Sequence, residues 1–315
     1  MCWVCRQARP ALVQTVESEE DTIAEHKNQL GFCRFKVGEF DAVALHEGTG
    51  GRPRPDGFVA NAPDAEVGEA HAQIGLPRDK VTVTFTVLLL DTGSQRILFD
   101  AGNGEAAASS RPAGRLVANL AAAGYAPADI DHVLISHFHG DHIAGLLAPD
   151  DTLAFPKAKV HVPRAEWAFW TSAEERSNAP ERLHATFDAT ERIFGIVGDR
   201  RAAFDWGDEV LPGITAMRAE GHTPGHTGFD ITSAGDRMMY VADITNNPLV
   251  YARNPDWQAS WDVLPDVAVE TRKRILGQAA DERLRLFFYH APFPSNGYVL
   301  RSSDGGYQFV PALWE

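Results

Sequence analysis

The sequence predicts an α/β protein with an αββα architecture, in which two mixed β-sheets pack face to face and helices cover the outside. Strand-like segments occur in two groups, one before and one after a helical stretch at about 165–195. Two such groups typically form two packed layers. The 315-residue chain contains no repeats and no Pro/Gly/Ser-rich linker, which indicates one layered domain.

The first group of strands begins with residues 81–90 (VTVTFTVLLL), which open with alternation and are rich in β-branched side chains. Residues 102–110 are small and predict a flexible segment. The other elements expected in this group are a turn at 91–93, strands at 96–100, 132–136 and 159–163, and a helix at 115–123.

The second group follows two helices expected at 165–177 and 180–195, the second with Pro180 at its start, where proline is favoured. Short β-rich segments separated by turn residues then predict a further set of strands. These strands are expected at 204–210, 214–218, 227–232, 237–242 and 284–289, with a helix at 265–278.

Charge and composition argue against several classes of partner. The chain has 29 Lys and Arg against 43 Asp and Glu, a net charge of −14, and no basic block. Nucleic acid and anionic membranes are therefore not expected as partners. No apolar run is long enough to span a bilayer. Residues 1–10 lack the pattern of a secretory signal, so we expect a cytoplasmic protein.

Residues 1–34 are expected to form a mobile N-terminal extension to a domain at 35–315. Cys2 and Cys5 form a C-x-x-C pair, but a structural zinc site needs about four ligands and Cys33 is the only other cysteine. We therefore interpret the pair as incidental, with a redox or metal site as the alternative. A homodimer contact through Trp3 is a further expectation.

Histidines cluster in one short segment of the chain. His137, His139, Asp141 and His142 spell H-x-H-x-D-H directly after the strand expected at 132–136. Imidazole and carboxylate groups suit zinc and similar divalent ions. Four ligands within six residues cannot all reach one tetrahedral ion, whereas alternate residues can point to two neighbouring ions. The motif therefore predicts further ligands elsewhere in the chain.

Three residues in the second half of the chain can supply those ligands. His222 lies in the turn-rich segment EGHTPGHTG, Asp243 ends the strand expected at 237–242, and His290 ends the strand expected at 284–289. Because all three lie where a predicted strand stops, one edge of the two sheets can collect them.

These motifs together resemble the metallo-β-lactamase superfamily over about residues 35–315. The resemblance rests on HFHGDH at 137–142, GHTPGHTG at 221–228, the aspartate after MMYVA and the strand-ending His290. It implies three ligands for a first metal ion (His137, His139 and His222), three for a second (Asp141, His142 and His290), and Asp243 as a bridge. It also implies that Asp100, in a D-x-G turn, orients the ligands from behind.

The resemblance implies a binuclear metal-dependent hydrolase. In this family pattern a hydroxide that bridges two divalent ions attacks a carbonyl or phosphoryl centre, and Asp141 exchanges a proton with the reacting groups. Asp141 and Asp243 are thus the expected catalytic carboxylates. Zinc is the first choice of metal, with manganese, iron and cobalt as alternatives that accept the same ligands.

Two segments, 114–146 and 290–314, resemble the methyl parathion hydrolase and lactonase group within the superfamily. That group carries a helical insertion, here at about 164–197, and the resemblance implies that Trp170 and Phe187 line an apolar pocket over the metals. Packing in a helix core is the alternative for both side chains.

The expected substrate is a lactone or an ester. Residues 102–111 are small and polar where phosphotriesterases of the group present an aromatic side chain, so a phosphotriesterase with a phosphotriester as primary substrate is the second choice. A non-catalytic metal-binding protein is a third alternative, which the complete ligand set disfavours.

Overall fold

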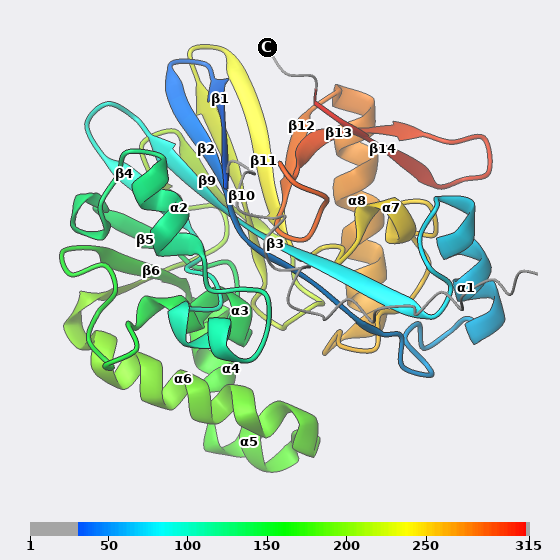
Figure 1. Cartoon of the computed structure of the whole chain (residues 1–315), viewed down its shortest axis with the longest axis horizontal. Coiled ribbons are helices and arrows are strands. Elements are labelled where there is room, and N and C mark those ends of the chain that lie inside the picture. The colour runs from blue at the N-terminus through cyan, green and yellow to red at the C-terminus, as the bar shows by residue number, and fades with distance from the viewer. Residues whose placement is uncertain (1–30, 313–315) are drawn as a thin grey trace, which may run out of the picture. The chain divides into compact units, whose positions relative to one another are not determined.

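The structure, a computed structural model, describes residues 31–312. Two seven-stranded sheets form its centre, with strand orders β1-β2-β3-β4-β5-β6-β7 and β14-β13-β12-β11-β10-β9-β8 (Figure 1). In the first sheet β1 to β4 pair antiparallel and β4 to β7 pair parallel. In the second sheet only β11 and β12 pair parallel. The predicted pair of mixed sheets is confirmed.

The first sheet is dominated by the long antiparallel pair of β2 and β3, whose apolar residues face both the second sheet and the helices. Its strands are β1 (Phe32–Val37), β2 (Phe40–Pro53), β3 (Lys80–Asp91), β4 (Arg96–Phe99), β5 (His132–Leu134), β6 (Lys159–Pro163) and β7 (Arg201–Phe204). The second sheet consists of β8 (Glu209–Leu211), β9 (Ile214–Arg218), β10 (Thr227–Ser233), β11 (Asp236–Ala242), β12 (Arg285–Phe288), β13 (Asn296–Arg301) and β14 (Tyr307–Pro311).

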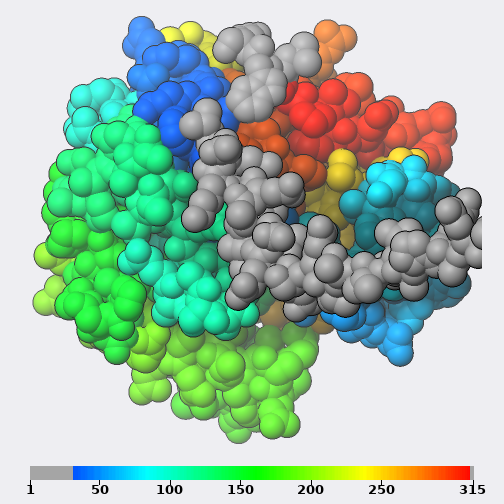
Figure 2. Space-filling view, viewed as in Figure 1, coloured from blue at the N-terminus to red at the C-terminus, as the bar shows by residue number. Residues whose placement is uncertain are grey.

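Helices cover the outer face of each sheet, as the αββα prediction requires. The α-helices are α1 (Asp64–Gln73), α2 (Leu116–Ala122), α3 (Gly140–Ile143), α4 (Arg164–Trp170), α5 (Ala173–Asn178), α6 (His184–Val197), α7 (Pro248–Tyr251) and α8 (Pro265–Glu282). In the space-filling view, the helical segment that ends with α6 (green) and the C-terminal strands (red) occupy opposite ends of one face (Figure 2).

The apolar core follows these layers. Between the sheets, Leu88, Phe99 and Phe229 are fully buried with other residues of both sheets. A second cluster packs the first sheet against α2 and α6, and a third packs the second sheet against α8, where Ile275 and Leu276 are buried. Burial on both faces explains why the second half of β3, residues 87–90, is a continuous apolar run.

Several boundaries differ from those expected. Strand β1 begins at Phe32, so residues 32–34 belong to the sheet and not to an extension. The strand expected at 204–210 is the end of β7 and the start of β8, which lie in different sheets. The helix expected at 165–177 is two helices, because Ser172 accepts a hydrogen bond from the Glu175 N–H and begins α5 as an N-cap.

The expected roles of Cys2, Cys5 and Trp3 concern residues outside the described range. Within residues 31–312, no helix is both long and apolar enough to cross a membrane.

Candidate metal centre

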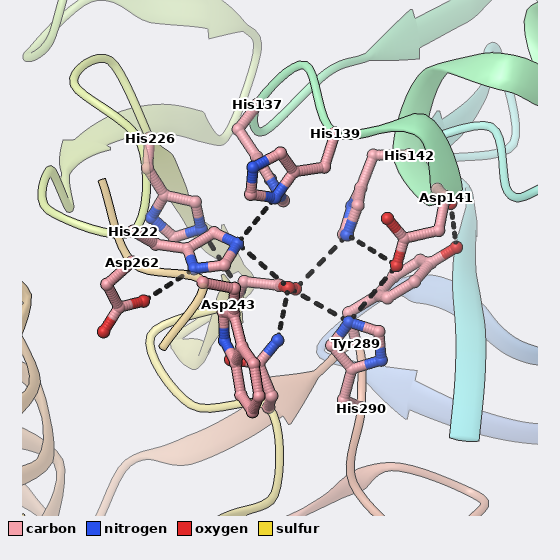
Figure 3. A network of polar contacts seen from close by, with 12 residues as sticks. His137, His139, Asp141, His142, His222, His226, Asp243, Asp262, Tyr289 and His290 are labelled. Carbon is pink, nitrogen blue, oxygen red and sulfur yellow. Dashed lines mark hydrogen bonds and ion pairs between the residues drawn. The ribbon is translucent and has the colours of Figure 1, made fainter. Parts of the chain in front are cut away.

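The predicted ligands are brought together by loops that follow four different strands. The 137–142 segment leaves β5 and enters α3, whose first turn contains Asp141 and His142. His222 lies between β9 and β10, Asp243 follows β11, and His290 follows β12. Figure 3 shows these side chains converging from both sheets. The prediction that one edge collects them agrees with this geometry.

The first group of candidate ligands contains three histidines whose ring nitrogens face one another. His139 Nδ1 lies 3.1 Å from His137 Nε2 and 2.9 Å from His222 Nε2. One nitrogen atom from each of the three rings lies within 4.8 Å of the chosen nitrogen atoms of the other two. Burial, reinforced by the neighbouring histidines, holds the pKa of His137 and of His139 well below its ordinary value. The neutral ring that results is the form that binds a metal ion.

The second group contains two histidines and a carboxylate. Asp141 Oδ2 lies 3.6 Å from His142 Nε2 and 3.4 Å from His290 Nε2. Burial lowers the pKa of His142, but Asp243, Asp100 and Asp141 raise it well above its ordinary value. These three carboxylates make the surroundings of His142 electronegative, and a bound divalent cation would neutralise that charge.

The carboxylate of Asp243 lies between the two groups. Its oxygens are 3.3 Å from His142 Nε2, 3.4 Å from His222 Nε2 and 3.0 Å from His290 Nε2. Asp243 Oδ1 and His142 Nε2 are both buried and have no hydrogen-bond partner within the described chain. Such orphaned buried polar atoms need a partner, and a divalent ion in each group would provide it. The donor set therefore fits a binuclear centre.

Asp100, which the resemblance implies to orient the ligands, contacts His142 of the second group and Ser136, the neighbour of His137 in the first group. It is fully buried and accepts hydrogen bonds from Ser136 N (2.7 Å), Ser136 Oγ (2.7 Å) and Tyr240 Oη (2.6 Å). Its Oδ2 also lies 2.8 Å from His142 Nδ1. The backbone of Asp100 has φ 65°, a conformation that non-glycine residues rarely adopt and that the surrounding contacts must hold in place.

Asp262 is a supporting residue that the sequence analysis missed. Its Oδ1 lies 2.9 Å from His222 Nδ1, and this contact fixes the ring so that Nε2 faces the first group. The buried Arg272 of α8 approaches Asp262 Oδ2 at 3.6 Å. No local motif surrounds Asp262, and it is 40 residues from His222. A histidine ligand commonly has such a partner, but the sequence does not say which carboxylate supplies it.

Glu166 is a second missed residue, and it joins the helical segment to both histidine loops. It is fully buried at the start of α4. Oε1 accepts hydrogen bonds from Phe138 N (3.2 Å) and Trp170 Nε1 (2.9 Å), and Oε2 accepts one from Gly225 N (2.8 Å). Phe138 lies between His137 and His139, while Gly225 lies in the loop of His222. Glu166 therefore sets the separation of the loops that carry the first group.

Replacing Glu166 with glutamine is expected to weaken metal binding in the first group by about 10–100-fold, the range for residues that support metal ligands. The substitution replaces one carboxylate oxygen with an NH2 group. This group cannot accept the hydrogen bond that a backbone or indole N–H donates to that oxygen in the natural protein. Chelator competition with metal analysis measures the effect. The matched control is Glu174→Gln, at an exposed position in α5. Equal chelator resistance in Glu166→Gln and the natural protein would contradict this role.

A cavity of about 480 Å³ opens over the candidate ligands. Its apolar wall includes Phe58, Val83 and Phe85, and its polar wall includes Ser110, Arg111 and Asn246. His139, Asp141, His222, Asp243 and His290 line its floor. The amide of Asn246 is oriented by a hydrogen bond from the Trp261 indole N–H, and its Nδ2 donates to Asp243 Oδ2 at 3.3 Å.

The prediction for Trp170 and Phe187 is wrong in this structure. Both side chains line a separate cavity of about 430 Å³ among α4, α5 and α6 and do not line the cavity over the ligands. The Trp170 ring lies 6.3 Å from the His139 ring, and its N–H donates to the buried Glu166. The aromatic wall over the ligands comes instead from Phe58, Phe85 and Trp261.

Glu47 holds the loop that forms the polar wall. It is the extra residue of a β-bulge in β2, where the pairing with β3 shifts between His46 and Gly48. A bulge turns a side chain out of the regular alternation. Here Glu47 Oε1 accepts hydrogen bonds from Asn103 N (3.1 Å) and Gly114 N (2.8 Å), and Oε2 accepts one from Asn103 Nδ2 (2.8 Å). The two ends of the 103–114 loop are thereby tied to β2.

Replacing Glu47 with glutamine is expected to remove a pH dependence of stability. Burial raises the pKa of Glu47 from 4.5 to about 7. The folded protein therefore retains a proton that the unfolded chain releases, and it loses stability as the pH rises from about 4.5 to about 7. The loss amounts to about 3 kcal/mol at ~1.4 kcal/mol per pKa unit. Urea unfolding at pH 5 and pH 8 measures it.

Glutamine fits this position because its oxygen can accept the same two backbone N–H groups. Its NH2 can donate to Asn103 Oδ1, a buried atom with no partner among the described residues, once that amide turns over. The difference in unfolding free energy between pH 5 and pH 8 should be smaller in Glu47→Gln by most of this amount, about 2.5 kcal/mol. Equal differences in both proteins would show that Glu47 does not titrate in this range.

The chain is similar to known proteins in both sequence and fold. Residues 80–290 match the family model of the metallo-beta-lactamase superfamily. The structure of AidC, described as a dizinc quorum-quenching lactonase in complex with a product, is 29% identical with a TM-score of 0.83, and the match covers 90% of this chain and 98% of that one. The hydrolase AbOPH is 25% identical with a TM-score of 0.84, over 92% and 100% of the two chains.

The N-acyl homoserine lactonase AiiA of Bacillus thuringiensis subsp. kurstaki is 26% identical over 177 residues, which are 56% of this chain. The chain spans 62% of the length of that relative.

Proposed function

The chain belongs to the metallo-β-lactamase superfamily, and we propose that it is a binuclear metal-dependent hydrolase that opens lactones or cleaves esters. The observation that carries the proposal is the position of Asp243, whose carboxylate is within 3.4 Å of histidines from both ligand groups. Two groups joined by one carboxylate suit a pair of divalent ions. We propose cytoplasm as its location.

Each ion would be held by residues that the geometry already groups. His137, His139 and His222 would hold the first ion, the second would be held by Asp141, His142 and His290, and Asp243 would contact both. Imidazole-rich sites of this kind favour zinc, which we propose as the metal. When bound, two such ions acidify water and polarise a carbonyl oxygen.

The two carboxylates would have different tasks because their exposure differs. The Asp141 side chain is 22% exposed and lines the cavity, so its oxygens can take a proton from, or return one to, a bound substrate. The Asp243 side chain is 2% exposed and is surrounded by histidines, so it positions the site. The Tyr289 hydroxyl donates to the backbone oxygen of Asp141 at 2.6 Å and fixes that residue relative to His142.

The choice of lactones and esters rests on the named relatives and on the cavity. AidC and AiiA are described as lactonases. The cavity volume of about 480 Å³ lies within the range of ordinary small-molecule sites. Its mixed apolar and polar walls suit a carbonyl compound with an alkyl or aryl substituent.

A substrate panel on protein of known metal content tests the proposal. The panel contains an N-acyl homoserine lactone, dihydrocoumarin, an aryl ester and a paraoxon-like phosphotriester. We expect close to two divalent ions per chain and the highest kcat/KM for a lactone or the ester. A higher kcat/KM for the phosphotriester would favour the phosphotriesterase alternative. Failure to turn over any member of the panel would support a non-catalytic metal-binding protein.

A further inference from the structure

Two positively charged side chains, Arg52 and Arg111, line the cavity. In the antiparallel pair of β2 and β3, Gly48 lies opposite Phe85, Gly50 opposite Val83 and Arg52 opposite Val81. Residues opposite one another share a face of the sheet. Phe85, Val83 and Val81 all line the cavity, and so does Arg52.

Gly48 and Gly50 allow the 103–114 loop to pack against β2. A Cβ atom at Gly48 would come within 2.0 Å of Pro112 O, and one at Gly50 within 3.3 Å of Pro112 Cγ. The loop therefore occupies the space that side chains at positions 48 and 50 would fill. With its ends also held by Glu47, it places Arg111 on the cavity wall together with Arg52.

Neither guanidinium has a carboxylate partner within residues 31–312. The neighbouring Arg54, in contrast, pairs with Asp64 at 2.8 Å. Two unneutralised arginines lining one cavity stand out in a chain with a net charge of −14. The carboxylates on the cavity floor, Asp141 and Asp243, are directed at the candidate ligand groups and so would be neutralised by the metal ions.

We propose that Arg52 and Arg111 form an anion-binding subsite for a carboxylate on the substrate, separate from the bond to be cleaved. A guanidinium presents paired N–H donors that match a carboxylate. The preferred substrates are then lactones or esters that carry an additional carboxylate on a short apolar chain. This inference rests on the proposed hydrolase function and narrows its substrate class.

The test uses two esters that differ only in charge, mono(4-nitrophenyl) adipate and its methyl ester. The first carries a free carboxylate and the second does not. We expect the natural protein to prefer the anionic ester and the preference to decrease with added salt, because salt screens the attraction. In the Arg52→Gln/Arg111→Gln double variant, the ratio of kcat/KM for the anionic ester to that for the neutral ester should fall about tenfold, as expected for lost charge-assisted hydrogen bonds. The control is Arg200→Gln, at an exposed position outside the cavity.

Calorimetric binding of adipate to metal-loaded protein separates this inference from the hydrolase proposal. We expect its Kd to rise about tenfold in the double variant and to stay the same in Arg200→Gln. Loss of adipate affinity without turnover of either ester would support the subsite and contradict the hydrolase. Equal kcat/KM for the two esters in the natural protein, or equal adipate affinity in the natural protein and the double variant, would overturn the subsite.

Discussion

Asp243→Asn is expected to reduce hydrolysis by more than about a hundredfold, beyond the range seen when residues behind a metal ligand are changed. The substitution keeps the size of the side chain but removes the charge that both ligand groups share. Three histidine nitrogens, on His142, His222 and His290, lie within 3.4 Å of this carboxylate. A neutral amide cannot offset two divalent ions at these positions, so metal content should fall with activity.

Metal analysis and kcat/KM for the best substrate of the panel measure the result. His142→Ala should give a similar loss of activity, because it removes a ring that contacts both Asp243 and Asp141. Asp199→Asn, at an exposed position, is the matched control. Circular dichroism and thermal unfolding check that each variant is folded. A folded Asp243→Asn protein with two ions per chain and activity within tenfold of the natural protein would refute the assignment.

The sequence points to the candidate ligands because each of them carries a local signal. The H-x-H-x-D-H segment places four of them within six residues, and His222, Asp243 and His290 each follow a strand that the sequence indicates. Alternation and β-branched residues likewise predicted β3, and β-rich segments on either side of a turn predicted β10 and β11, close to their observed ranges.

Supporting residues were missed because their contacts are not local. Glu166 reaches Gly225 across 59 positions, and Asp262 reaches His222 across 40. No periodicity links such pairs before the chain folds. The mistaken placement of Trp170 has a related cause. Aromatic residues at helical spacing indicate that one face of α4 is apolar. The end of the helix before Ser172 and the packing of α6 decide which cavity that face lines.

Sheet membership is also a property of the whole fold. Residues 204–210 appear as one β-rich segment, yet the chain leaves the first sheet after Phe204 and enters the second at Glu209. The hydrogen-bond partners on each side decide this division, and they come from β6 and β9. The polar cavity wall also depends on strand pairing. Glu47 can hold the 103–114 loop because the pairing of β2 with β3 contains a bulge at this residue.

Asp100→Asn is expected to weaken binding of both metal ions, whereas Asp262→Asn should weaken only the first. Asp100 Oδ1 accepts the Ser136 N–H, and its Oδ2 receives Ser136 Oγ and Tyr240 Oη and contacts His142 Nδ1. An asparagine must place its NH2 against at least one of these donors. Displacement of Ser136 disturbs the adjacent His137 of the first group, and His142 of the second group loses its charged partner.

We expect Asp100→Asn to lower the affinity for both ions and kcat/KM by about 10–100-fold. A lower free energy of unfolding should accompany this loss, because each buried donor left without an acceptor costs about 1–3 kcal/mol. Tyr240→Phe is the matched comparison, since it removes one donor to Asp100 and leaves the carboxylate in place. Among the candidate ligands, Asp262 contacts only His222. Under chelator conditions that remove two ions per chain from Asp100→Asn, Asp262→Asn should therefore lose only one. Two ions retained in Asp100→Asn at the affinity of the natural protein would show that Asp100 supports the fold and not the metal centre.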